Sequence, residues 1–232
     1  MGIHIENVGI DGHGFKYLLF FLLLYLVGSP FLDPYPSVAI LVHLSLSVTL
    51  FVAVYTVQKH HQRRSVAIVL LLALLVLYWL GLYDVIRFSR LGSYLLFVVY
   101  FGLLMYSYIM QLARFQKVTV NVLYATLCLY LIIGLFWGAL YTLLNELSPG
   151  SYSGVLLDNV QDSPLHIFNY FSMVTLTTLG YGDITPQTPG AGALCQMEAI
   201  IGQFFTAVVV AWLVGSIITE KETKILKTEI EE

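Results

Sequence analysis

Charged residues are scarce in this 232-residue sequence. Asp, Glu, Lys and Arg make up 11% of it, against about 25% in soluble domains, whereas hydrophobic residues make up 58%. So few charges cannot supply the polar surface of a soluble protein, and we expect a membrane protein in contact with lipids. The net charge of −3 provides no basic surface, so we expect no nucleic-acid partner.

Cysteine is equally rare. Cys128 and Cys195 both lie in apolar stretches, which argues against a disulfide framework and against a zinc site. No Ser/His/Asp, metal-binding or phosphate-binding constellation occurs, and the His60–His61 pair belongs to a basic loop. We therefore expect neither enzymatic activity nor a cofactor.

Long uncharged apolar runs, in contrast, occur six times. A membrane span needs about 20 apolar residues, so the first run is marginal and the others are comfortable. The prolines of Gly28–Pro30 and of 33–36 end the first run. The runs cover residues 17–32, 37–58, 65–83, 91–113, 118–145 and 199–219. This pattern predicts an all-α membrane protein with six transmembrane helices.

The distribution of Lys and Arg predicts how the chain crosses the membrane. With both termini in the cytoplasm, nine of the 11 Lys and Arg residues lie inside, all except Arg87 and Arg90. This bias agrees with the positive-inside rule and predicts a multi-pass protein of the plasma or inner membrane. The alternative of a cleaved signal peptide is disfavoured by the acidic Glu6 and Asp11 ahead of the first run.

The connection between the last two runs carries a motif, Thr177–Asp183, that reads TTLGYGD. Gly180 and Gly182 permit a positive φ, so that successive carbonyls can turn to one side. Rings of carbonyls from four chains can replace the hydration shell of a potassium ion. The longer run 170–186, YFSMVTLTTLGYGDITP, resembles the potassium channel family, whose Thr-x-Gly-Tyr-Gly signature matches Thr178–Gly182.

This resemblance implies a pore domain over residues 118–219. It would contain an outer helix, a re-entrant pore helix with its filter loop between helices 5 and 6, and an inner helix. Ser163-Pro164 predicts the start of the pore helix, which should end near Thr177 and point its negative C-terminal end at the ions. Since each chain carries one filter copy, we expect a homotetramer.

The resemblance also assigns the ion ligands. The K+ ligands would be the carbonyls of Thr178, Leu179, Gly180 and Tyr181, with the Thr178 hydroxyl, and Gly182 would complete the filter. Leu179 replaces the valine that is usual in the family. Tyr181 is expected to face away from the ions and to hold the strand against the pore helix.

Three other residues are candidates for filter support, and a fourth is a candidate hinge. Asp183 would lie at the outer mouth and accept a hydrogen bond from Tyr170, whereas Phe171 offers packing only; plain helix packing of both residues is the alternative. Glu198 is an ionisable residue within the last span, which points to a function. We expect it behind the filter, bonded to the pore helix in its protonated form; a structurally paired or snorkelled carboxylate is the alternative. Gly202 occupies the family's hinge position, with close packing through a small residue as its alternative.

The first four spans form a transmembrane domain, residues 1–117, that we predict not to sense voltage. A voltage sensor carries several Arg or Lys in its fourth span, but residues 91–113 contain no charge and Arg87 and Arg90 precede them. His43 is expected to form a hydrogen bond between two helices. Residues 220–232 form a short cytoplasmic tail that could extend the inner helix.

The function implied is passive, potassium-selective conduction. Two alternatives are a poorly selective cation channel and a non-conducting membrane sensor or assembly protein that retains the pore fold. The intact Gly-Tyr-Gly order and the filter threonine argue against both.

Overall fold

The computed structural model describes residues 14–32, 39–57, 61–82, 89–113, 119–158 and 164–231. Almost all of this part of the chain is helical, as the apolar runs predict. The elements are α1 (Gly14–Leu32), α2 (Ala39–Val57), α3 (His61–Leu82), α4 (Ser89–Leu112), α5 (Val120–Leu147), β1 (Tyr152–Ser153), α6 (Val155–Asp158), α7 (Leu165–Leu176), β2 (Thr185–Pro186) and α8 (Pro189–Glu231).

Five of the described helices are long and apolar enough to cross a membrane. Their apolar parts are Gly14–Phe31, Arg64–Gly81, Ser89–Leu112, Val120–Leu147 and Pro189–Val209. The apolar part of α2, Ile40–Thr56, is shorter, and residues 33–38 and 58–60 beside α2 lie outside the description. The first run, predicted to be marginal, is thus long enough, and the full length of the second run is not tested by the described residues. The sixth span stays a prediction.

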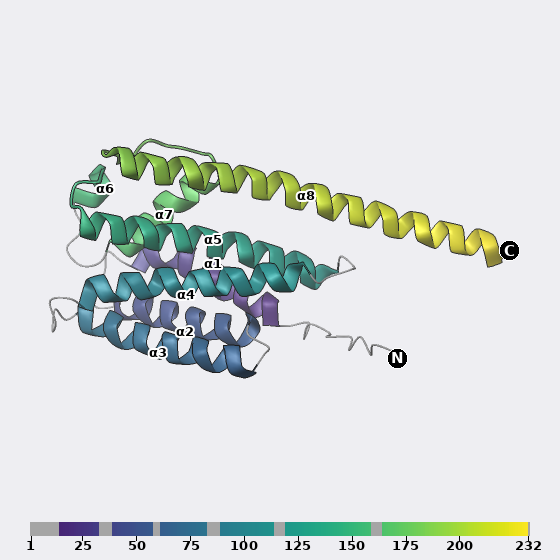
Figure 1. The fold of residues 1–232 in the computed structure, drawn as a ribbon, viewed down its shortest axis with the longest axis horizontal. Coiled ribbons are helices and arrows are strands. Elements are labelled where there is room, and N and C mark those ends of the chain that lie inside the picture. The colour runs from purple at the N-terminus through teal and green to yellow at the C-terminus, as the bar shows by residue number, and fades with distance from the viewer. Residues whose placement is uncertain are drawn as a thin grey trace.

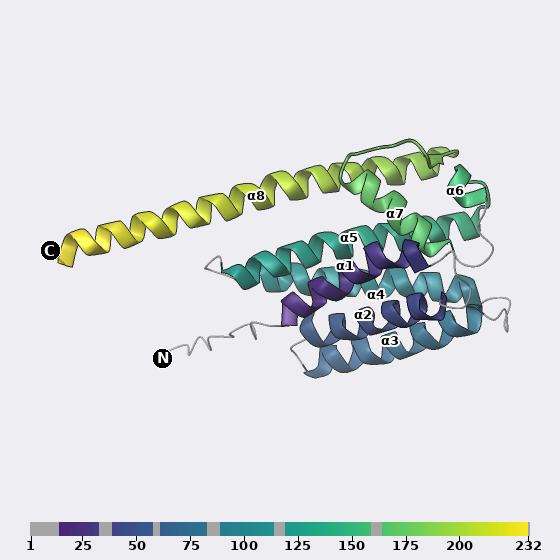
Figure 2. The same ribbon diagram turned by 180° about the vertical axis from the view of Figure 1, so that it is seen from behind.

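Helix α5 lies in the middle of the molecule, in contact with α1, α4, α7 and α8. Helix α1 begins at the end of the bundle beyond which α8 extends, whereas α6 and the start of α8 lie at the opposite end (Figures 1 and 2). Strand β1, which follows α5, pairs with β2, which precedes α8, so that Tyr152 faces Pro186 and Ser153 faces Thr185. The chain therefore leaves α5 and enters α8 at the same end, with α7 between them.

Polar side chains connect the first four helices to one another. Nδ1 of His43 on α2 lies 2.7 Å from the hydroxyl of Tyr78 on α3, which is the helix-to-helix hydrogen bond predicted for this histidine. On α4, the Tyr100 hydroxyl donates to the Leu50 carbonyl of α2. Arg90 lies in the first turn of α4, inside this candidate span and not before it as predicted. Arg87 lies outside the described residues.

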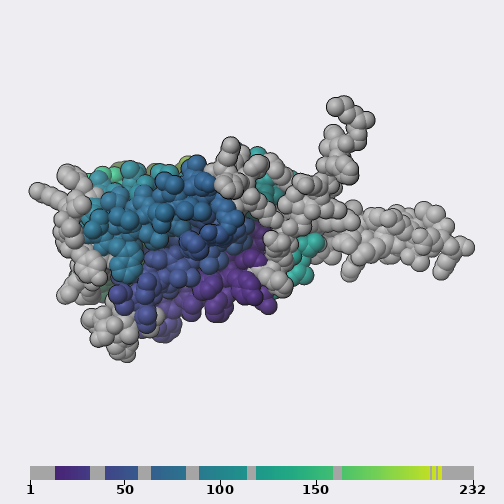
Figure 3. Space-filling view, turned by 90° about the horizontal axis from the view of Figure 1, so that it is seen from below, coloured from purple at the N-terminus to yellow at the C-terminus, as the bar shows by residue number. Residues whose placement is uncertain are grey.

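The first helices also present a broad apolar surface. Figure 3 shows the purple α1 side chains beside the blue side chains of the helices that follow. The large exposed apolar residues of α1 and α2 are Tyr17, Phe20, Leu23, Leu24, Val27, Phe31, Ile40, Leu41, Leu44, Val48, Phe51 and Tyr55. Such a surface suits hydrocarbon and not water, in keeping with a membrane domain.

Candidate functional site

Helix α7 is the short helix on which the pore prediction depends. Its 12 residues extend over about 18 Å, too little to cross a bilayer. The helix begins at Leu165, so Pro164 is its N-cap and not its first helical residue as predicted. It ends at Leu176, with Thr177 as its C-cap, in agreement with the predicted end near Thr177. Ser163, the predicted N-cap, lies outside the described residues.

Two glycines of α5 allow α7 to pack closely against it. A Cβ atom on Gly138 would lie 2.2 Å from Oδ1 of Asn169 and 3.0 Å from its Cα. A Cβ on Gly134, one turn earlier, would meet the Met173 side chain at 2.3 Å. This small-xxx-small spacing is typical of close helix contacts in membranes. A larger residue at position 138 would therefore push α7 away from α5.

The C-terminal end of α7 leads into the predicted filter through a Schellman motif. The Thr178 N–H donates to the Thr175 carbonyl and the Leu179 N–H donates to the Val174 carbonyl, both at 2.9 Å, which is the bond pair of this motif. Its left-handed residue is Thr178, with a φ of 60°, where glycine is usual. A β-branched residue in this conformation costs on the order of 1–3 kcal/mol. The backbone is therefore strained at the first predicted ion ligand.

Left-handed residues then alternate along the filter. After Thr178, positive φ values recur at Gly180 (57°) and Gly182 (75°), but not at Leu179 or Tyr181. In an extended strand, successive residues face opposite sides. Reversing the handedness of every second residue turns successive carbonyls toward a common side. The filter backbone thus has the alternation that its glycines predict.

Filter side chains are exposed within one chain. Leu179 and Tyr181 are 55% and 66% exposed. Tyr181 is predicted to hold the strand against the pore helix, and this role stays a prediction.

The predicted contact at the outer mouth is present. The Tyr170 hydroxyl donates to Oδ2 of Asp183 at 2.5 Å, and Oδ1 of Asp183 accepts from the Ile184 N–H at 3.0 Å. Partial burial and the hydrogen bond to Asp183 raise the pKa of Tyr170 to about 12. Phe171 is buried against the Tyr141 and Tyr152 rings, in agreement with a packing role only.

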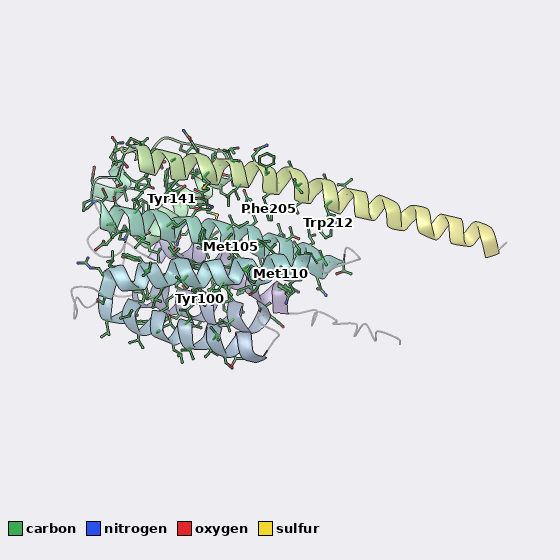
Figure 4. All side chains as sticks on the ribbon, viewed as in Figure 1. Tyr100, Met105, Met110, Tyr141, Phe205 and Trp212 are labelled. Atoms are coloured by element: carbon green, nitrogen blue, oxygen red, sulfur yellow. The ribbon has the colours of Figure 1, made fainter. Side chains whose placement is uncertain are left out.

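Glu198 lies behind α7 and is fully buried. Its Oε1 is 2.5 Å from the Ser172 hydroxyl of α7, and its Oε2 accepts from the Tyr141 hydroxyl of α5. The same Ser172 hydroxyl is 2.7 Å from the Gly134 carbonyl. The carboxyl group thus joins α5, α7 and α8, and Figure 4 shows Tyr141 in this region between α5 and α8. The snorkelled alternative is excluded, and the predicted partner on the pore helix is present.

Gly202 is buried against the end of the pore helix. A Cβ atom there would lie 2.1 Å from the Leu176 carbonyl oxygen, and α8 continues as one helix through this position. Nearby, Phe205 lies on the α5 side of α8 (Figure 4), with its ring 5.3 Å from the Tyr130 ring. The contact is the close packing named as the alternative for Gly202, and the hinge stays a prediction.

Several residues of this site were not predicted. Ser172 and Tyr141 bond to Glu198, and Asn169 on α7 donates to the Tyr25 hydroxyl of α1 at 3.1 Å. The sequence offers no signal for these three pairings. The Gly134-x-x-x-Gly138 spacing, in contrast, is a sequence signal from which the close contact between α5 and α7 could have been predicted.

The protein-family model described as "Ion channel" matches residues 125–219. This part of the chain is an ion channel domain. It comprises most of α5, the segment with α7 and the filter, and the first part of α8, so the family resemblance predicted from residues 170–186 is confirmed. No curated protein matches the chain.

Proposed function

We propose that the chain assembles as a homotetramer and conducts potassium ions passively across the cell membrane. The observation that carries this proposal is the alternating backbone of Thr178, Gly180 and Gly182, at the end of the pore helix. Carbonyls turned to one side, repeated in four chains, form the rings that replace potassium hydration. The ligands in this proposal are the Thr178 hydroxyl and the carbonyls of Thr178, Leu179, Gly180 and Tyr181; no enzymatic step or cofactor is involved.

The surface of α8 supports assembly around a shared axis. Only 11% of its apolar window is buried within one chain, against 61% of the α5 window. Its large exposed apolar residues include Met197, Ile200, Ile201, Phe204, Val208 and Trp212. Irregular backbone at membrane depth is tolerated only in contact with protein or a water-filled path. Neighbouring copies would cover both this face and the exposed filter.

A re-entrant pore loop agrees with the β1–β2 pairing, which returns the chain to one end of the molecule. With the filter outside, the end of the bundle where α1 begins, and beyond which α8 extends, faces the cytoplasm. This is the orientation that the Lys and Arg distribution favours. Helix α2 would then complete six spans. Residues 118–219 would conduct, residues 1–117 would surround the pore, and the 220–232 tail would continue α8.

Reversal potentials in planar bilayers test the proposal. With potassium opposite sodium, we expect a strongly shifted reversal potential for the reconstituted protein. Gly180→Asp and Gly182→Asp introduce a side chain where φ is 57° and 75°, and each should abolish selective flux. A reversal potential near zero indicates the poorly selective channel. Absence of any current from correctly assembled protein indicates the non-conducting alternative.

A further inference from the structure

We propose that Tyr25 and Asn169 form a positioning pair through which α1 holds the pore helix and its filter. This inference rests on the proposed potassium channel function, because the pair is assigned a role in holding the filter of that channel. It assigns the first helix, which lies outside the matched ion channel domain, a direct part in the pore.

Helix α1 packs against both α5 and α7 of its own chain. Figure 2 shows the purple α1 running beside α5, with its later half near α7. Tyr25 is 2% exposed and Asn169 is 4% exposed, and Nδ2 of Asn169 donates to the Tyr25 hydroxyl at 3.1 Å. The bond is therefore a buried contact between two helices that lie about 140 residues apart in the sequence.

Asn169 is held tightly on its other sides. Its Cα atom lies 3.0 Å from the position that a Cβ would take on Gly138, so the backbone of α5 blocks movement in that direction. Its Oδ1 atom is buried and has no hydrogen-bond partner among the residues that the structure describes. The amide group therefore depends on Tyr25 for its hydrogen bonding.

Consecutive residues of α7 then connect α1 to the filter. Asn169 bonds to α1, and Tyr170 bonds to Asp183 directly after the filter glycines. A shift of the pore helix allowed by the loss of the Tyr25 bond would move Tyr170, and with it the outer end of the filter. Tyr25 thus acts through Asn169 and not on the ion itself.

Tyr25→Phe removes the hydroxyl and keeps the ring, so it tests the bond with little change in packing. Tyr100→Phe is the matched control, because Tyr100 is equally buried and its hydroxyl donates to Leu50 within the first four helices. Interhelical hydrogen bonds in membranes change equilibria by about threefold on average, and at most about twentyfold. We expect Tyr25→Phe to raise deuterium exchange of peptides covering 165–183 by about threefold, and Tyr100→Phe to leave them unchanged.

A second readout uses potassium flux from liposomes. Tyr25→Phe should accelerate the decay of flux after activity starts, whereas Tyr100→Phe should not. Asn169→Ala should do the same, and adding Tyr25→Phe to it should produce no further change, because the pair is already broken. Equal exchange over 165–183 in the parent, Tyr25→Phe and Tyr100→Phe proteins overturns the inference. A parent protein without flux refutes the proposed channel function instead, and the exchange experiment still decides the role of the pair.

Discussion

Replacement of Glu198 tests whether its carboxyl group braces the pore helix. The Ser172 hydroxyl has one proton but two acceptors in reach, Oε1 of Glu198 at 2.5 Å and the Gly134 carbonyl at 2.7 Å. A protonated Glu198 resolves this conflict: its own O–H donates to Ser172, and Ser172 donates to Gly134. The Tyr141 hydroxyl donates to the remaining carboxyl oxygen. Every polar group of the cluster is then satisfied.

Replacements of Glu198 by Gln and by Ala differ in which hydrogen-bonding groups of the cluster lose their partners. In Glu198→Gln, the amide N–H donates to Ser172 and the amide oxygen accepts from Tyr141, so we expect a loss below about 1 kcal/mol. In Glu198→Ala, Ser172 still reaches Gly134, but the Tyr141 hydroxyl loses its acceptor, which costs about 1–3 kcal/mol. The cavity left behind, roughly 50 Å³, adds on the order of 1 kcal/mol. We therefore expect Glu198→Ala to lower the free energy of unfolding by about 2–4 kcal/mol.

Denaturant titration of the purified protein measures these differences, and the decay of potassium flux reports on the filter. Glu146→Ala, an exposed carboxylate at the end of α5, is the control and should change stability by less than about 0.5 kcal/mol. Adding Tyr141→Phe to Glu198→Ala removes the stranded hydroxyl and should recover part of the loss. If Gln is as damaging as Ala, Glu198 acts as an ionised group and the proton count above is wrong. If neither replacement changes the free energy of unfolding or the decay of flux, Glu198 does not brace the pore helix.

Two other predictions concern voltage and pH. Arg90 is the sole charged residue in the described part of α4, and it lies in the first turn. One charge that moves through the full membrane field contributes about 2.3 kcal/mol per 100 mV. With so few charges in this helix, we expect a shallow conductance–voltage curve. A steep curve that persists without blocking ions would show that another part of the chain senses voltage. The pKa of Tyr170 is raised to about 12, so its bond to Asp183 should stabilise the folded state in full below about pH 10 and be lost as the pH rises through about 12. The 295 nm difference spectrum between the parent and Tyr170→Phe proteins should therefore titrate near pH 12, and a midpoint near 10 would contradict the bond.

The sequence predicted the helices because their apolar length is a property of each segment alone. The full length of the second span stays a prediction, because the described apolar part of α2 is Ile40–Thr56 and the residues beside it lie outside the description. The sequence also predicted the backbone of the filter correctly, because Gly180 and Gly182 are the residues that permit a positive φ. Thr178 also has a positive φ, but its residue type does not predict this conformation. The conformation follows from the Schellman motif that ends α7.

Apart from the hydrogen bonds of His43 and Glu198, the contacts between the helices were beyond prediction, for a physical reason. Helices such as α1 and α2 are apolar on all sides. Their sequences therefore lack the contrast between an apolar and a polar face that would predict which face packs inward. In lipid, that choice depends on small residues and on buried polar groups that must find partners. Gly134 and Gly138 select the face of α5 that receives α7, and Asn169 and Ser172 then select the partners Tyr25 and Glu198. The polar residues of this domain, few as they are, therefore determine how its apolar helices pack around the pore helix.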